Sequence, residues 1–221
     1  MKILNLYACL GGNRYKWDEV TQVEVTAVEW DEELARLYQE RFPKDKVIVA
    51  DAHQYLLDHY KEFDFIWSSP PCPTHSKVRV TQKNQDFYIP KYPDMGLYQE
   101  VIFLKEHFKG KYVVENVTPY YEPLILAQKR GRHLYWCNFN LPHKIDRENA
   151  KGIMCGQTTR ELDKLCDFHK IDRKFLESYK GKQTKIKIIR NLVDYEVGRT
   201  ILEIALGIMK KQNTKQTELF M

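Results

Sequence analysis

The segment Lys2-Ile3-Leu4-Asn5-Leu6-Tyr7-Ala8-Cys9-Leu10-Gly11-Gly12 is a short apolar run that ends in two glycines. A run of this length, bounded by glycine, is typical of a buried β-strand followed by a tight turn. Glycine at the end of a strand lets the backbone approach a bound molecule closely. The segment therefore predicts a strand over residues 2 to 7 and a ligand-binding turn directly after it.

Strand-like and helix-like segments alternate beyond this turn. The expected strands span residues 22–29, 46–50, 63–67, 111–114 and 131–139, and the expected helices span 31–42, 52–60, 97–108 and 194–210. A polar loop is expected over residues 74–93. The βαβαβ order at the start favours an α/β fold with a doubly wound, mostly parallel sheet, whose ligands bind at the carboxyl ends of the strands.

Length and composition restrict the class of protein. With 221 residues and 43% hydrophobic residues, the chain has room for one well-packed α/β domain and a small appendage. It has no apolar run of the roughly 20 residues needed to cross a bilayer, and its N-terminus lacks the features of a secretory signal. Five irregularly spaced cysteines do not form a disulfide framework. We therefore expect a cytoplasmic protein.

Basic residues are concentrated in one segment. Between Lys144 and Arg190 there are 13 Lys and Arg residues against 7 Asp and Glu residues, whereas the whole chain has a net charge of only +5. Such a segment is typical of phosphate contacts in nucleic-acid binding. A solvated lysine-rich surface would have the same composition, and charge alone does not separate the two interpretations.

Two carboxylates follow successive predicted strands. Glu29 ends the second strand, where it could accept hydrogen bonds from ribose hydroxyls, and Asp51 follows the third, where it could meet an adenine amino group. Acidic residues also begin helices, so each of these two residues alone is weak evidence for a ligand contact. Their shared position at one sheet edge, beside the Gly11-Gly12 turn, predicts an adenosine pocket.

A single cysteine lies between prolines after the fourth strand, in Ser69-Pro70-Pro71-Cys72-Pro73. Proline fixes φ, so the backbone around the thiol is stiff. A thiol held at the carboxyl end of a buried strand is a candidate nucleophile. The alternative is a buried structural cysteine.

Six motifs, in order along nearly the whole chain, resemble the cytosine-5 DNA methyltransferase family. They are Asn5 to Gly12, Glu29-Trp30, Asp51, Pro70-Pro71-Cys72, Glu115-Asn116-Val117, and Gln128-Lys129-Arg130-Gly131-Arg132, with Arg190-Asn191-Leu192-Val193 and Val197-Gly198 similar to the closing motif. The resemblance implies a Rossmann-like methyltransferase fold that uses S-adenosylmethionine. The cofactor-binding residues it implies are Tyr7, Ala8, Cys9, Gly11, Gly12, Glu29, Trp30, Asp51, Ala52, Pro70, Asn191 and Val193.

The same resemblance implies that Cys72 adds to cytosine and that Glu115 acts as the general acid at ring N3. The other implied catalytic residues are Asn116, which holds the base and the backbone of its motif, and Arg130 and Arg132. We expect these two arginines to point to opposite faces of one strand, so that at most one of them faces the base. The target cytosine must be flipped out of a duplex or already be single-stranded.

Three departures from the family pattern concern the cofactor and the target. Asn5 replaces the expected Asp, and Cys9 replaces the first glycine of the turn, which affects cofactor geometry. Only residues 133–190 separate the last two motifs, so the target-recognition region is very small and sequence specificity is short, degenerate or absent. The chain is thus identified as a compact, prophage-like member of the family.

We divide the chain into a catalytic and cofactor-binding domain (1–140), a small basic target-recognition region (141–189), a closing helix (190–210) and a flexible tail (211–221). Within the tail, Gln216, Leu219 and Phe220 resemble the peptide by which bacterial and phage proteins dock on the replicative sliding clamp. Cys137, His143, Cys155, Cys166 and His169 lack the paired spacing of a zinc site, so no metal is expected. A monomer is the default.

The leading hypothesis is a DNA (cytosine-5)-methyltransferase that forms a covalent adduct through Cys72. The first alternative is a tRNA cytosine-5 methyltransferase, because tRNA-acting relatives carry the same catalytic motifs. The second is a catalytically silent, DNA-binding regulator on the same fold. The sequence is equally compatible with a restriction-modification, a regulatory and a phage self-protection role.

Overall fold

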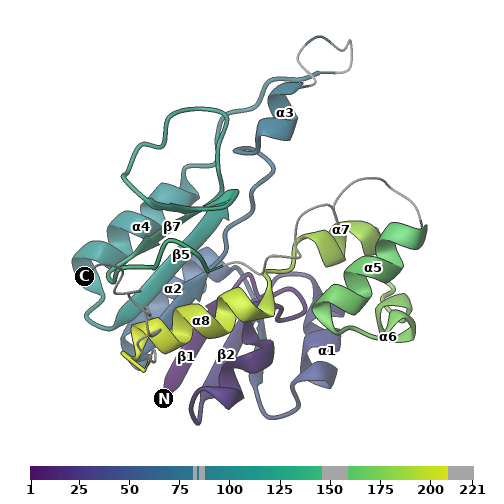
Figure 1. Cartoon of the computed structure of the whole chain (residues 1–221), viewed down its shortest axis with the longest axis horizontal. Helices are drawn as coiled ribbons and strands as arrows, with labels where there is room; N and C mark the ends of the chain where they lie inside the picture. The colour runs from purple at the N-terminus through teal and green to yellow at the C-terminus, as the bar shows by residue number, and fades with distance from the viewer. Residues whose placement is uncertain (82–83, 85–87, 146–158, 209–221) are drawn as a thin grey trace, which may run out of the picture.

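The computed structural model describes residues 1–81, 84, 88–145 and 159–208. These residues form a seven-stranded sheet in the order β3-β2-β1-β4-β5-β7-β6 (Figure 1). The strands are β1 (Lys2–Leu6), β2 (Glu24–Glu29), β3 (Lys46–Val49), β4 (Phe65–Ser68), β5 (Lys111–Val117), β6 (Gln128–Arg130) and β7 (His133–Cys137). Strands β3, β2, β1, β4 and β5 run parallel to one another, whereas β7 is antiparallel to both β5 and β6. The predicted α/β class with a mostly parallel sheet is confirmed.

Helices follow most of the strands. They are η1 (Asn13–Glu19), α1 (Glu32–Arg41), α2 (Ala52–His59), η2 (Tyr60–Glu62), α3 (Lys77–Thr81), α4 (Gly96–His107), α5 (Thr159–His169), α6 (Arg173–Glu177), α7 (Lys185–Arg190) and α8 (Tyr195–Ala205). Among the described residues, no helix has the length and apolar character needed to cross a membrane.

The sheet is buried on both faces because successive side chains of a strand point in opposite directions. Leu4 and Leu6 of β1 pack on the face that α2 and α4 cover. Ile3 lies on the opposite face, where Trp17 of η1 and Ile201 of α8 join the core. Figure 1 shows α8 across the near face, with α2 and α4 behind the sheet. Strands buried on both faces read as continuous apolar runs, as β1 and β4 do.

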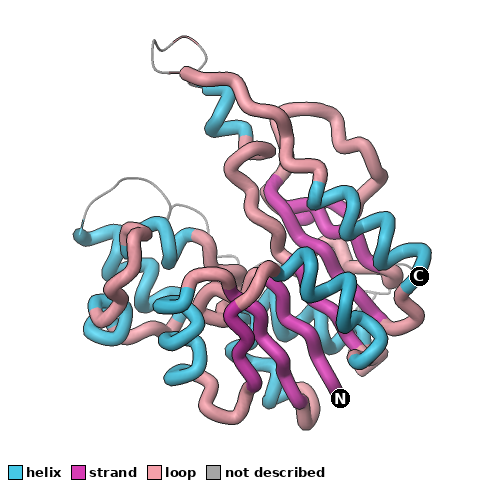
Figure 2. The backbone as a smooth tube through the Cα atoms, turned by 180° about the vertical axis from the view of Figure 1, so that it is seen from behind, coloured by secondary structure: helices cyan, strands magenta, loops and turns pink. Residues whose placement is uncertain are grey.

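The three short helices α5, α6 and α7 form a second, smaller core with α1. Leu162 and Leu165 of α5 and Ile188 of α7 pack against Leu34 of α1 and against Leu10, in the turn after β1. Figures 1 and 2 show this group on one side of the strand ends, while the segment that carries α3 projects on the other. Helices α5, α6 and α7 of the basic segment are therefore packed directly onto α1 and the turn after β1.

Several elements differ from the sequence-based expectations. The segment predicted as one strand over 131–139 begins only at His133, because Gly131 has a φ of +54° and forms a turn between β6 and β7. The closing helix stops at Ala205, and Gly207 follows in the left-handed region at φ +67°. Helices η1, α3, α5, α6 and α7 were not predicted, because they are short or lack a long apolar stripe.

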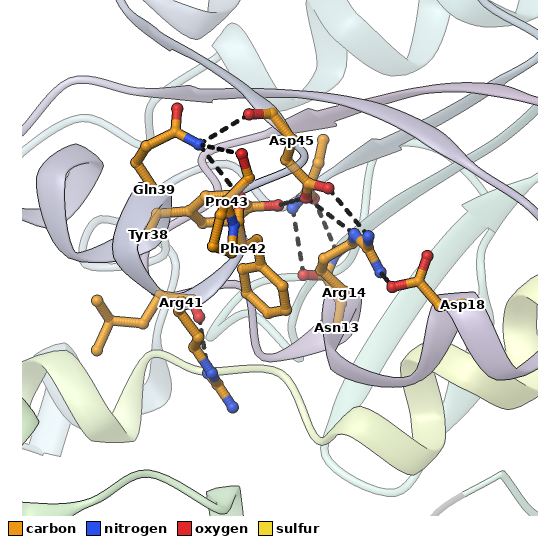
Figure 3. A network of polar contacts seen from close by, with 11 residues as sticks. Asn13, Arg14, Asp18, Tyr38, Gln39, Arg41, Phe42, Pro43 and Asp45 are labelled. Carbon is orange, nitrogen blue, oxygen red and sulfur yellow. Dashed lines mark hydrogen bonds and ion pairs between the residues drawn. The ribbon is translucent and has the colours of Figure 1, made fainter.

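A buried ion pair holds η1 to the loop after α1 (Figure 3). Arg14 donates from Nε and from Nη2 to the two carboxylate oxygens of Asp45, both at 2.9 Å. The hydroxyl of Tyr38 donates to the same carboxylate at 2.9 Å. Each of the two charged side chains is only 3% exposed. The remaining partner of Arg14 is Asp18, at 2.9 Å, which is 67% exposed.

Helix α8 approaches η1 at van der Waals distance through Gly198. A Cβ placed on this residue would lie 2.1 Å from the carbonyl oxygen of Asn13, so a larger residue does not fit. The Gly198 carbonyl in turn accepts a hydrogen bond from Nε1 of Trp17 at 3.2 Å. This close contact explains why the closing motif carries glycine here.

We expect Asp45→Asn to lower the free energy of unfolding by about 3–5 kcal/mol, because it removes the buried counter-charge of Arg14 and leaves only the exposed carboxylate of Asp18, while keeping the side-chain size. Urea denaturation followed by far-UV circular dichroism measures the change. The matched control is Asp18→Asn, which removes the exposed partner of the same guanidinium and should cost about 1 kcal/mol or less. Equal losses in the two variants would contradict the role assigned to Asp45.

Candidate active site

One cavity of about 1400 Å³ lies at the carboxyl ends of β1, β2, β4 and β5. Its lining includes every predicted cofactor residue except Gly11 and every predicted catalytic residue except Arg130. The structure thus brings together Cys72, Glu115, Asn116, Arg132, Tyr7, Ala8, Cys9, Gly12, Glu29, Trp30, Asp51, Ala52, Pro70, Asn191 and Val193. The convergence follows from the parallel order of these strands, whose carboxyl ends meet at one edge.

Backbone hydrogen bonds hold the loop that presents Cys72. The Cys72 carbonyl accepts from the backbone N–H groups of His75 and Ser76, both at 3.0 Å. The His75 carbonyl then accepts from Tyr120 N at 3.0 Å, which joins this loop to the segment after β5. The thiol is therefore positioned by a closed turn and by its prolines.

Burial raises the pKa of the Cys72 thiol, and the negative charge of Glu115 raises it further. Arg132 and Lys187 act in the opposite direction. With its pKa above the ordinary value, the thiol keeps its proton at neutral pH, and the fraction of thiolate increases as the pH rises. A backbone hydrogen bond to the thiol and the two cations therefore favour the nucleophilic form.

Glu115 and Asn116 lie side by side near the end of β5 and are both buried. The Glu115 carboxylate faces the cavity, with Nε2 of His133 at 3.5 Å from its Oε1. The Asn116 amide donates to the Pro70 carbonyl at 2.9 Å, two residues before Cys72. Asn116 therefore joins β5 to the nucleophile loop, the backbone role expected of it.

The two arginines of the Gln128–Arg132 motif separate, as expected, but for a different reason. They do not share one strand, because the turn at Gly131 lies between them. Arg132 lines the cavity. Arg130 points away from it, and its guanidinium donates to the carbonyls of Leu141 and Pro142. Arg130 is therefore corrected to a residue that holds the chain after β7.

The carboxylates at the ends of β2 and β3 retain acceptor capacity. Glu29 accepts from Cys9 N at 2.8 Å through Oε2 and from Asp31 N at 3.0 Å through Oε1, and burial raises its pKa. Asp51 caps α2 through Oδ1, which accepts from His53 N and Gln54 N. Its Oδ2 has no hydrogen-bond partner among the residues that the structure describes.

The two carboxylates and a nearby aromatic ring fit adenosine. Trp30 directly follows Glu29 in the sequence and lines the cavity. Its side chain is 72% exposed, so its ring is available for stacking on a base. Ribose hydroxyls and an adenine amino group are donors, and the free lone pairs of Glu29 and Asp51 are acceptors. The residues present are thus compatible with S-adenosylmethionine, the cofactor that the sequence resemblance implies.

The turn after β1 adopts unusual backbone angles. Gly11 has a φ of +66°, and a Cβ there would lie within 2.7 Å of the rings of Phe42 and Tyr38. Gly11 thus packs closely against α1, and it is not among the residues that line the cavity. Tyr7 and Cys9 also have positive φ, at 57° and 47°. Cys9 thereby occupies a conformation that favours glycine, which the family pattern has at this position.

A buried polar network lies beside Tyr7 and was not predicted from the sequence. Glu100 of α4 is 1% exposed and accepts from Tyr7 Oη at 2.6 Å and from Ser68 Oγ at 2.5 Å. His53 Nδ1 lies 3.1 Å from the same carboxylate, and this hydrogen bond raises the pKa of His53. A glutamate inside the apolar stripe formed by Leu97 and Val101 was the available signal.

Other cavity residues came from segments without a recognised motif. They are His53, Asp94, His133, Tyr135, Phe168, His169, Gln183 and Lys187, among others. As for metal, no group of three His, Cys, Asp or Glu residues gathers within the described part of the chain. Cys155, one of the cysteines considered for zinc, lies outside the described residues.

We expect alkylation of Cys72 by iodoacetamide at pH 8 to report the charges around the thiol. Lys187→Met removes a cation, raises the thiol pKa further and should slow the reaction about threefold. Glu115→Gln removes an anion and should accelerate it by a similar factor. Cys72→Ala supplies the background from the other cysteines. Changes in the same direction for both variants would refute this electrostatic account.

The profile of the C-5 cytosine-specific DNA methylase family matches residues 1–122. No curated protein matches the sequence. Among solved structures, the Entamoeba histolytica methyltransferase EhMeth has a TM-score of 0.58 at 10% identity, covering 96% of this chain and 99% of its own. A DNMT2 variant from Spodoptera frugiperda has a TM-score of 0.54 at 17% identity, covering 93% and 99%.

At these identities the solved structures show a shared fold, that of methyltransferases. The family profile carries more, because it spans over half of the chain and includes the turn after β1, both cofactor-side carboxylates, Cys72 and Glu115. The resemblance seen in the motifs is thereby confirmed, and the chain belongs to the C-5 cytosine-specific DNA methylase family.

Proposed function

We propose that this protein transfers a methyl group from S-adenosylmethionine to carbon 5 of a cytosine in DNA, through a covalent adduct with Cys72. The observation that carries the proposal is a single cavity lined by two sets of residues. Cys72 and Glu115 supply a nucleophile and an acid, and Glu29, Trp30 and Asp51 supply an adenosine site. A methyl donor and a reacting base could therefore meet in one space.

The chain's own residues account for activation of the base. The Cys72 thiolate adds to C6 of the cytosine, and Glu115 donates a proton to N3, which neutralises the charge that develops on the ring. C5 thereby becomes nucleophilic. When bound, S-adenosylmethionine supplies the electrophilic methyl group. A water molecule then takes the C5 proton, which lets the thiolate leave, and the N3 proton returns to Glu115.

Lys187 and Arg132 have a particular place in this scheme. They are the cations that lower the pKa of Cys72 against the effect of burial. Both side chains are exposed at the cavity, so both can also face a phosphate of the bound nucleic acid. The thiolate is then favoured by residues that contact the substrate strand.

Target recognition is assigned to the basic region over residues 141–189, within the proposed division of the chain. Its described lysines include Lys180, Lys182 and Lys185, which precede or begin α7. Phosphate contacts from such lysines position a strand without reading its sequence. The proposal therefore includes short or degenerate sequence specificity.

The first experiment offers labelled S-adenosylmethionine with unmethylated genomic DNA and, in parallel, with total tRNA. We expect 5-methylcytosine in DNA, and at least about a thousandfold loss of label with Cys72→Ser, because the hydroxyl is a far weaker nucleophile. The matched control is Cys137→Ser. Cys137 accepts from Gln128 Nε2 and donates to Phe139 O outside the cavity, and a hydroxyl can replace both contacts.

Other outcomes would replace the proposal. Label in tRNA but not in DNA would favour the tRNA cytosine-5 methyltransferase, for which the same catalytic motifs serve. Cofactor binding without label in either nucleic acid would favour the silent DNA-binding regulator. Full activity of Cys72→Ser would remove the covalent mechanism.

The adenosine site has its own test. Asp51→Asn keeps an efficient helix cap for α2 but turns an amide N–H₂ toward the adenine amino group. We expect S-adenosylmethionine to bind about tenfold more weakly in isothermal titration calorimetry, with the thermal midpoint of unfolding unchanged. Asp58→Asn, an exposed change on the same helix, is the control. Unchanged affinity in Asp51→Asn would contradict the assigned contact.

Three further predictions concern partners and role. The clamp-binding peptide around Gln216, Leu219 and Phe220 lies outside the described residues, and deletion of residues 216–221 with activity on short oligonucleotides as the control tests it. The monomer is tested by light scattering at several concentrations. A phage or restriction-modification role stays a prediction for which the host genome context is the test.

A further inference from the structure

One histidine is paired with the candidate acid, and no motif includes it. In the antiparallel pair of β5 and β7, Glu115 lies opposite Tyr135 and Val117 lies opposite His133. Residues two apart on a strand share a face, so these four side chains point to the same side, and all four line the cavity. His133 and Glu115 are thus diagonal cross-strand neighbours, a separation that long side chains can bridge.

The contact itself is specific. Nε2 of His133 lies 3.5 Å from Oε1 of Glu115, and the two side chains are 25% and 10% exposed. Of the Lys, Arg and His side chains in the described ranges, His133 is the one within 4.0 Å of this carboxylate. Arg132, the cavity-lining arginine of the adjoining motif, makes no ion pair with Glu115 within that distance. The acid therefore depends on His133 for its polar environment.

The position of His133 also suits proton exchange. Its partial exposure gives the imidazole access to water in the cavity, while Glu115 is more deeply buried. Imidazole can bind and release a proton at near-neutral pH, unlike any other side chain that could take this position.

We propose that His133 and Glu115 exchange a proton and that His133 keeps Glu115 in the protonated form that donates to cytosine N3. This proposal rests on the proposed function. In the resting pair, Glu115 carries the proton and faces Nε2 of neutral His133. As the Cys72 thiolate adds to C6, Glu115 passes the proton to N3, leaving a carboxylate beside neutral imidazole. On elimination of the thiolate the N3 proton returns to Glu115, and the C5 proton, taken by water, is the one proton released in each cycle.

His133 is a positioning residue in this scheme, because it acts on the base only through Glu115. The test must therefore separate proton supply from simple hydrogen bonding. Two variants do so: His133→Phe removes both nitrogens, whereas His133→Gln keeps an N–H donor of similar reach that cannot give up its proton. His107→Phe is the matched control, since His107 is exposed at the end of α4 and outside the cavity lining.

The readout is the rate at which Cys72 is trapped on an oligonucleotide containing 5-fluorocytosine, in the presence of S-adenosylmethionine. Fluorine cannot leave C5 as a proton does, so the adduct persists and its formation is timed on denaturing gels. We expect His133→Phe and His133→Gln both to slow trapping by at least about tenfold, with KM for the nucleic acid within about threefold of wild type. His107→Phe should trap at the wild-type rate.

A double-mutant cycle with Glu115→Gln locates the effect. If His133 acts through Glu115, His133→Phe should slow trapping no further in the Glu115→Gln background. Three results would overturn the proposal: an unchanged rate in His133→Phe, a wild-type rate in His133→Gln, or an equal loss of rate with and without Glu115. Failure of the wild-type protein to trap at all would instead count against the proposed function, so the two failures are distinguishable.

Discussion

The buried ion pair of Arg14 and Asp45 is the contact on which the cofactor side of the molecule depends. It joins η1, which begins directly after the Gly11-Gly12 turn, to the loop between α1 and β3. The Tyr38 hydroxyl, on the buried side of α1, donates a hydrogen bond to the same Asp45 carboxylate. A charge pair that loses one member in a dry environment is strongly destabilising. The turn that faces the adenosine site is therefore held at both ends, by β1 and by this pair.

The antiparallel strand β7 has the corresponding role on the catalytic side. Because β7 runs back along β5, the turn before β7 places Arg132 at the cavity and His133 beside Glu115. The reversal of one strand thus supplies two of the polar groups around the reacting position.

Sequence reasoning reached the features that depend on local pattern. The strands up to β5 were predicted because they are short runs rich in apolar and β-branched residues. Cys72 was placed because it lies at the carboxyl end of a strand, and Glu115 because its motif resembles that of the family. Side-chain and backbone orientations that depend on tertiary contacts were not predicted. The outward turn of Arg130 results from a hairpin at Gly131, and the orientation of Gly11 results from its packing on α1. Glu100 reads as a surface residue until the sheet closes over it.

Helices α5 to α7 share a core with Leu10 and Leu34, and this has a consequence for how specificity can change. A recognition segment that is a separate lobe can be exchanged between relatives without disturbing the catalytic half. Here the buried faces of these helices also support the turn after β1 that lines the cavity. If these helices recognise the target, as proposed, a new target preference is expected to arise by substitution of their outward-facing lysines instead of by exchange of a module.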